Sequence, residues 1–269
     1  MTFDNAYLSI GQIDRLSYQD TVIHHLDPRS KVVATAAFIL AVVSFPKYEI
    51  ASLAPFFLFP VVLASLADIP VRIIIRKVVF VSPFAIFVGM FNPLFDTRIV
   101  GSLFGLAVSA GWFSFFSILI KFTLTISAAL ILIATTSFPG VCHGLRRLGA
   151  PPLFVSQLLF LYRYLFVLLE EAMRIARARE IRSFGKKGMG AKVAVRIIGV
   201  LFIRTVERSE RIYRAMLCRG FTGEIPVLSR HRAGWPDVLF LGITALLLVA
   251  GRFLPLTHMA GRLAQRVLP

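Results

Sequence analysis

Long apolar runs separated by short polar links follow one another along most of this chain. The runs occupy residues 32–45, 50–67, 78–95, 101–136, 152–169 and 236–254. A hydrocarbon core about 30 Å thick is crossed by about 20 helical residues, so the pattern predicts an all-α, polytopic membrane protein with about five to six membrane helices. Lys121 interrupts the fourth run, which leaves open one long tilted helix or two shorter helices.

The charges between the runs predict an orientation. Basic residues gather between the second and third runs, after the fourth run and throughout 170–234, whereas the links after the first and third runs carry almost no net charge. Because cytoplasmic loops are enriched in lysine and arginine, we expect a cytoplasmic N-terminus and a return to the cytoplasm at 138–150. The fifth run has basic flanks on both sides, so we interpret it as the start of a long interfacial helix that continues through 184. One further span, 236–254, leaves the side of the C-terminus open.

Composition narrows the class of protein. Hydrophobic residues make up 57% of the 269 positions, above the roughly 45–50% of soluble domains. The net charge is +16, and the basic residues lie beside the apolar runs while the aromatic residues lie inside them. This favours a basic membrane face over a nucleic-acid-binding surface. Cys142 and Cys218 form no CxxC pattern, and the His24–His25 pair lacks a further ligand at a suitable spacing, so no metal site is predicted.

Two basic stretches of helical character follow the fourth run. The first is predicted over 152–184 and the second over about 191–217, and in both an acidic residue precedes an arginine by four positions. Gly220 is placed to end the second helix with a positive φ. Arg182 and Arg219 therefore stand near the C-terminal tips of the two helices. Such arginines either cap their own helices on a solvated face or make forked contacts with a partner's carboxylates and carbonyls.

Four stretches carry a resemblance to one family. They are HHLDPRSK at the first run, TTSFPGVCHGLRRLGAPP after the fourth, LYRYLFVLLEEAMRIARAREIRSFG over the first basic helix, and RTVERSERIYRAMLCRGFTGE over the second. Taken in this order, they resemble the transmembrane T component of energy-coupling factor (ECF) importers, in its CbiQ-like, cobalt-importing branch. The resemblance extends from about residue 10 to residue 235.

The resemblance implies two long cytoplasmic coupling helices that cross, each ending in an Ala-Arg-Gly-type motif seated in a groove of an ATPase subunit. The matching ATPase-coupling residues here are Ile181, Arg182 and Ser183 in the first motif, and Cys218, Arg219 and Gly220 in the second. The two arginines match the family pattern. Ile181, Ser183 and Cys218 depart from it at the flanks, where small residues favour close docking.

The resemblance also implies a protein that neither binds nor hydrolyses ATP itself. The chain agrees with this, since it contains no GxxxxGK[ST] phosphate loop and no recognisable set of catalytic side chains. We expect no enzyme activity, no cofactor, and no catalytic or metal-binding residue. The implied partners are two ABC ATPase subunits, a CbiM-like substrate-binding S component, membrane lipid and, as an open option, a small accessory membrane subunit. Nucleic acid is not expected as a partner.

The expected function is to transmit the motion of the ATPase subunits to the S component of an importer in the inner (cell) membrane. Cobalt is the expected cargo, with nickel or a vitamin as alternatives. An alternative of a different class is a stand-alone membrane protein whose basic loop binds anionic lipid or nucleic acid. The expected division of the chain is an N-terminal membrane domain (1–150), the coupling helices (151–234), and a C-terminal membrane helix with its tail (235–269).

Overall fold

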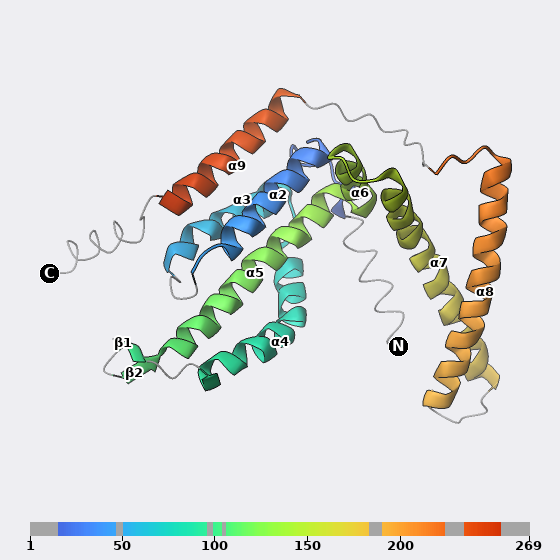
Figure 1. The fold of residues 1–269 in the computed structure, drawn as a ribbon, viewed down its shortest axis with the longest axis horizontal. Helices are drawn as coiled ribbons and strands as arrows, with labels where there is room; N and C mark the ends of the chain where they lie inside the picture. The colour runs from blue at the N-terminus through green and yellow to red at the C-terminus, as the bar shows by residue number, and fades with distance from the viewer. Residues whose placement is uncertain are drawn as a thin grey trace. The chain divides into compact units, whose positions relative to one another are not determined.

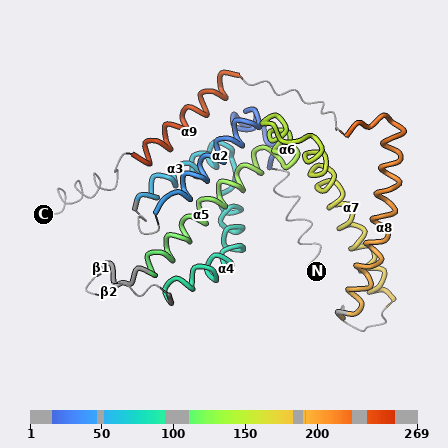
Figure 2. The backbone as a smooth tube through the Cα atoms, in the orientation of Figure 1, coloured from blue at the N-terminus to red at the C-terminus, as the bar shows by residue number. Residues whose placement is uncertain are grey.

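The computed structural model describes residues 16–46, 51–95, 99–103, 106–182, 190–223 and 234–253. Its elements, in chain order, are α2 (Pro28–Val43), the 3-10 helix η1 (Ala51–Phe57), α3 (Leu58–Leu66), α4 (Val71–Phe95), β1 (Ile99–Leu103), β2 (Leu106–Ser109), α5 (Ala110–Thr136), α6 (Phe138–Arg147), α7 (Pro152–Arg182), α8 (Ala191–Cys218) and α9 (Trp235–Phe253). The chain divides into two compact units. One holds α6, α7 and α8, and the other holds the remaining elements (Figures 1 and 2). The predicted division at residues 150 and 234 stays a prediction.

The helices confirm the predicted all-α, polytopic class. Within the described residues, four helices are long and apolar enough to cross a membrane, namely Val71–Pro93, Gly111–Thr136, Pro152–Arg182 and Trp235–Phe253. The surface of α4 also fits a membrane segment, because large apolar side chains are exposed on it. Phe80 is 84% exposed and Phe84 is 69% exposed. Contiguous apolar surface of this kind requires lipid or a partner protein to cover it. How many of the shorter apolar helices also cross the membrane stays a prediction.

The fourth apolar run contains one long helix rather than two. α5 is continuous, and the residues before it form a short antiparallel hairpin in which Leu103 pairs with Leu106. The hairpin was not anticipated, because residues 101–109 continue the apolar run without a break in composition. Lys121 is accommodated inside α5 by a hydrogen bond from its Nζ to the Phe45 carbonyl oxygen at 2.6 Å. The charge therefore does not end the helix.

The core of the unit that contains α2 combines aromatic and aliphatic side chains. Phe38 and Phe56 are fully buried, as is Leu124 of α5. The Phe38 ring stacks on Phe59 with centroids 4.3 Å apart. α9 packs on the same core through Gly251, where an added Cβ would lie 3.0 Å from the Phe56 ring. Glycine at this position therefore lets α9 approach η1 closely.

Asp237, near the start of α9, joins this helix to the start of α2. Its Oδ1 accepts hydrogen bonds from the Asp27 backbone N–H at 2.7 Å and the Ser30 hydroxyl at 3.2 Å. Its Oδ2 accepts from the Gly234 backbone N–H at 2.8 Å, which is one half of a capping box. Asp237 is 6% exposed, and its bonds to Asp27 and Ser30 are buried, so water does not replace these two bonds.

We expect the Asp237→Ala substitution to destabilise the folded protein by about 2–3 kcal/mol, because the buried donors of Asp27 and Ser30 lose their acceptor. Asp237→Asn keeps one acceptor oxygen and should cost less. The measurement is thermal unfolding of the purified protein in detergent. Asp20→Ala, at a residue whose side chain is 87% exposed, is the matched control. An unfolding temperature of Asp237→Ala equal to that of the control would contradict this role.

Candidate coupling surface

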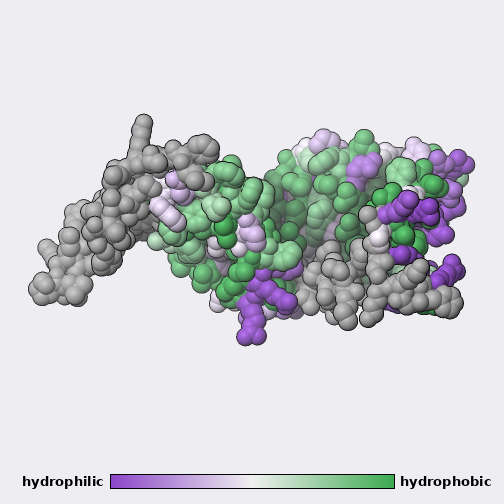
Figure 3. Space-filling view, turned by 90° about the horizontal axis from the view of Figure 1, so that it is seen from below, coloured by the Kyte–Doolittle hydropathy of each residue, from purple (hydrophilic) through white to green (hydrophobic). Residues whose placement is uncertain are grey.

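α7 is apolar in its first half and basic in its second, and α8 is basic along most of its length. Figure 3 shows hydrophilic side chains gathered over this pair of helices. The start of α7 is tied to the segment after α8, because the Ser156 hydroxyl donates a hydrogen bond to the Gly223 carbonyl oxygen at 3.0 Å. The Phe160 and Phe221 rings lie 6.3 Å apart, centroid to centroid. The C-terminal end of α8 therefore lies against the N-terminal half of α7.

The end of α8 has the backbone geometry that the sequence predicts. Gly220 has φ +76°, and its N–H donates to the Leu217 carbonyl oxygen at 3.0 Å. The Phe221 N–H donates to the Met216 carbonyl oxygen at 3.0 Å. These two bonds form a Schellman motif, which requires a left-handed residue after the helix. Gly220 thus ends α8 directly after Arg219.

The two arginine tips are exposed. Ile181 and Arg182 are the last residues of α7, and the Ile181 side chain is 77% exposed. Cys218 closes α8, Arg219 and Gly220 follow it, and all three are exposed. Ser183 lies outside the described residues. The coupling role of these six residues stays a prediction.

The structure places the two tips at opposite ends of the helix pair rather than together. Phe160 of α7 contacts Phe221 beyond the end of α8, whereas Glu171, three turns later in α7, contacts Arg204, far earlier in α8. The two helices therefore run in opposite directions (Figure 1). α8 has 28 residues, which makes it about 40 Å long at the helical rise. Arg182 and Arg219 can accordingly meet two separate partner surfaces.

Glu171 connects the two helices at mid-length. Its Oε1 lies 3.0 Å from Nη1 of Arg204, and its Oε2 lies 3.8 Å from Nη1 of Arg208. Its side chain is 23% exposed, so this ion pair is better shielded from water than Glu170–Arg174, whose side chains are 63% and 77% exposed. Sequence reasoning missed it. The residues lie 33 positions apart, and the rule for neighbouring turns of one helix finds local pairs alone.

The Glu171→Gln substitution should loosen α7 from α8 while keeping the size of the side chain. We expect a loss of about 1 kcal/mol, because the pair is partly exposed and such ion pairs contribute little each. The measurement is the distribution of distances between spin labels placed on the exposed faces of α7 and α8, which should broaden. Glu170→Gln removes the same charge one residue away and should leave the distribution unchanged. Equal broadening in both variants would exclude a tie at Glu171.

The histidines near the start of α2 take part in local contacts. Nδ1 of His24 lies 2.7 Å from the Thr21 hydroxyl, and its Nε2 lies 3.0 Å from the Leu16 carbonyl oxygen. Burial lowers the pKa of His24, and His25 pairs with Asp20. Among the described residues, no group of three His, Cys, Asp or Glu side chains is arranged to hold a metal ion.

Comparison with known proteins identifies similar chains. The sequence model of the family described as cobalt transport protein, CbiQ, matches residues 19–231. An uncharacterised protein of Methanocaldococcus jannaschii is 29% identical over 255 residues, 86% of this chain and 83% of that protein. The cobalt transport protein CbiQ of Rhodobacter capsulatus is 32% identical over 123 residues, 45% of this chain and 50% of that protein. The energy-coupling factor transporter transmembrane protein EcfT of Bacillus selenitireducens is 28% identical over 222 residues, 76% of this chain and 81% of that protein.

Proposed function

This chain belongs to the CbiQ cobalt transport protein family, whose members are transport components of ECF type rather than enzymes, and we propose that it passes the motion of two ATPase subunits to a substrate-binding S component. In this role the chain performs no chemistry. It supplies stiff helices that connect the ATPases to the membrane. The observation that carries the proposal is the pair of exposed arginine tips, Arg182 and Arg219, at opposite ends of two paired helices.

The proposed contact is an arginine seated in a groove of each ATPase subunit. Arg219 lies directly after the last helical residue of α8, where its charge is favourable for the helix dipole. Its guanidinium can donate several hydrogen bonds to carbonyls or carboxylates of a partner. Gly220 leaves room beside it, while Ile181 and Cys218 supply an apolar side chain and a small one next to the two arginines. Ser183 completes the first motif.

The opposite ends of the helix pair favour two ATPase subunits over one. A single groove cannot receive tips at opposite ends of a helix pair in which α8 alone is about 40 Å long. The closing of two subunits would push on both tips at once. The tie at Glu171 would then make α7 and α8 respond together.

The proposed orientation follows from the charges. The basic coupling helices and the N-terminus face the cytoplasm of a cell with an inner membrane, as the positive-inside rule predicts. The apolar surface of α4 faces lipid or the S component. Nucleic acid has no part in this proposal.

Cobalt is the proposed cargo, because the family description and the Rhodobacter capsulatus relative both name cobalt transport. The cargo would be held by a CbiM-like S component rather than by this chain. Nickel or a vitamin would be carried by the same coupling machinery with a different S component. A small accessory membrane subunit is compatible with the proposal.

The test is co-expression with two ATPase subunits and a CbiM-like S component from the same genome. We expect the affinity-tagged chain to retain all of them in detergent, and cells that contain the complete set to accumulate radioactive cobalt while ATP is present. Accumulation of nickel instead of cobalt would identify nickel as the cargo. Recovery of the chain without ATPase subunits, together with salt-sensitive binding to polyanions, would favour the stand-alone membrane protein.

A further inference from the structure

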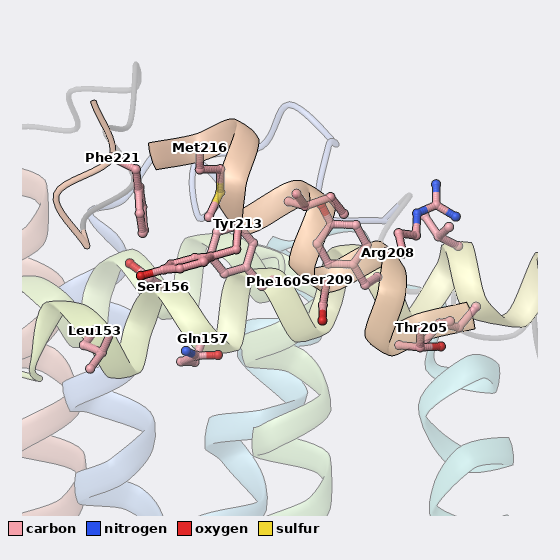
Figure 4. Close-up of a pocket in the computed structure, with 14 residues that line it drawn as sticks. Leu153, Ser156, Gln157, Phe160, Thr205, Arg208, Ser209, Tyr213, Met216 and Phe221 are labelled. Carbon is pink, nitrogen blue, oxygen red and sulfur yellow. The ribbon is translucent and has the colours of Figure 1, made fainter. Parts of the chain in front are cut away.

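An apolar groove runs between α7 and α8. It has a volume of about 310 Å³, within the usual range of sites for small ligands. Its walls include Phe160, Tyr164 and Leu168 of α7 and Ile212, Tyr213 and Met216 of α8. Figure 4 shows these walls with Phe221 at one end and Arg208 toward the other. The groove is shaped to receive a flexible apolar chain.

One end of the groove opens onto cationic side chains. Arg208 and Ile212 line both the groove and a neighbouring cavity of about 610 Å³. That second cavity is also lined by Arg204 and Arg211, and by Glu171 of α7 and Glu207 of α8. Three arginines against two glutamates leave an excess of positive charge at the open end. An anionic group would complement it, since arginine forks readily onto phosphate oxygens.

The α7 wall has the composition of a membrane segment. The groove uses α7 from Leu153 to Leu168, inside the helix that is long and apolar enough to cross a bilayer. The α8 wall, by contrast, belongs to a basic helix. A molecule that suits both walls has an apolar tail and a negative head, and membranes supply such molecules in bulk.

From this combination we infer that the groove is a binding site for a membrane phospholipid with an anionic headgroup. The acyl chain lies between Phe160 and Ile212, and the phosphate lies against Arg208 and Arg211. The bound lipid fills the space between the two helices and neutralises the excess charge at the open end of the groove. This inference does not depend on the proposed coupling to ATPases, because it concerns the chain in its membrane without any partner.

The test uses phosphatidylglycerol that carries a photoreactive group in its acyl chain. The full chain is reconstituted in phosphatidylcholine vesicles that contain a small fraction of this probe, and the labelled peptides are mapped by mass spectrometry. We expect labelling of 153–168 and 205–216 to exceed that given by the same probe with a phosphatidylcholine headgroup by about fivefold, the factor that one arginine contributes near an anionic membrane surface.

Matched variants test separately the site of the acyl chain, in the groove, and the site of the phosphate, at Arg208 and Arg211. Ser209→Trp fills the groove and should abolish the labelling, whereas Val206→Trp, on a residue outside both cavities, should not. Arg211→Gln should remove the preference for phosphatidylglycerol and leave the tail labelling, whereas Arg196→Gln should keep the preference. The second pair retains the size of the groove, so it tests the inference even if Ser209→Trp fails to fold.

Three results would overturn the inference. Equal labelling by the two headgroups would mean an ordinary lipid-facing surface. An unchanged preference in Arg211→Gln would exclude the proposed head site. Labelling of 153–168 and 205–216 that persists in Ser209→Trp would place the probe outside the groove.

Discussion

Arg182→Glu combined with Arg219→Glu is expected to abolish both assembly with the ATPase subunits and transport. Both tips are exposed at the ends of their helices, so reversing their charge leaves the fold and membrane insertion intact. At the interface, a buried partner group would lose its counter-charge and meet a like charge, which costs on the order of 2–5 kcal/mol for each contact. The two losses should add, because the two contacts are made by separate residues at opposite ends of the helix pair.

Single and double variants are expected to differ in the number of ATPase subunits that they bind. Because the tips lie at opposite ends of the helix pair, each single variant should lose binding to one ATPase subunit and retain binding to the other. Arg177→Glu with Arg196→Glu introduces the same charge change on exposed residues away from the tips, and it should assemble normally. The measurements are affinity capture of the ATPase subunits and cobalt uptake. Normal capture and uptake by the double tip variant would refute the arginine anchors.

The second large effect concerns membrane topology, which is measured by whether single cysteines react with a thiol reagent outside the cell. We expect a cysteine at position 148 to resist a membrane-impermeant thiol reagent in intact cells and to react after the cells are opened. Leu148 is 48% exposed, whereas Gly149 has φ +104°, a conformation in which cysteine would be strained. The background carries Cys142→Ser and Cys218→Ser.

The same experiment needs single cysteines at positions that are predicted to lie on the cytoplasmic side and on the outer side of the membrane. A cysteine at 188 should behave like that at 148, because no crossing is predicted between them, and a cysteine at 48 should react in intact cells. α7 is long and apolar enough to span a bilayer, so this is a sharp test of the interpretation. Labelling of 148 but not 188 from outside would make α7 a true span and would change the number of membrane helices.

Helix positions could be predicted well from the sequence because proline, glycine and apolar length mark them. α7 begins at the predicted Pro152, and α8 ends at Cys218, two residues before Gly220, which has the expected positive φ. These features depend on the local chain, where the backbone preferences of single residues decide the outcome. The positions of Arg182 and Arg219 near the helix ends therefore follow from the local sequence alone.

Contacts between distant residues could not be predicted in this way. In the sequence, Lys121 interrupts an apolar run. The carbonyl oxygen that accepts its hydrogen bond belongs to Phe45, 76 positions away. The Glu171 tie and the buried Asp237 acceptor likewise depend on how helices pack. A single sequence, considered by itself, gives no signal for which charges meet across a fold.

The most direct test of the coupling role uses the native Cys218, which is exposed beside Arg219. Cys142 is buried, and burial raises the pKa of its thiol to about 11, so a benzophenone maleimide should modify Cys218 selectively. In the assembled complex, illumination is expected to cross-link Cys218 to a groove of an ATPase subunit, and the yield should fall when Arg219 is replaced by glutamate. An assembled, transporting complex in which Cys218 never cross-links to an ATPase subunit would contradict the coupling role.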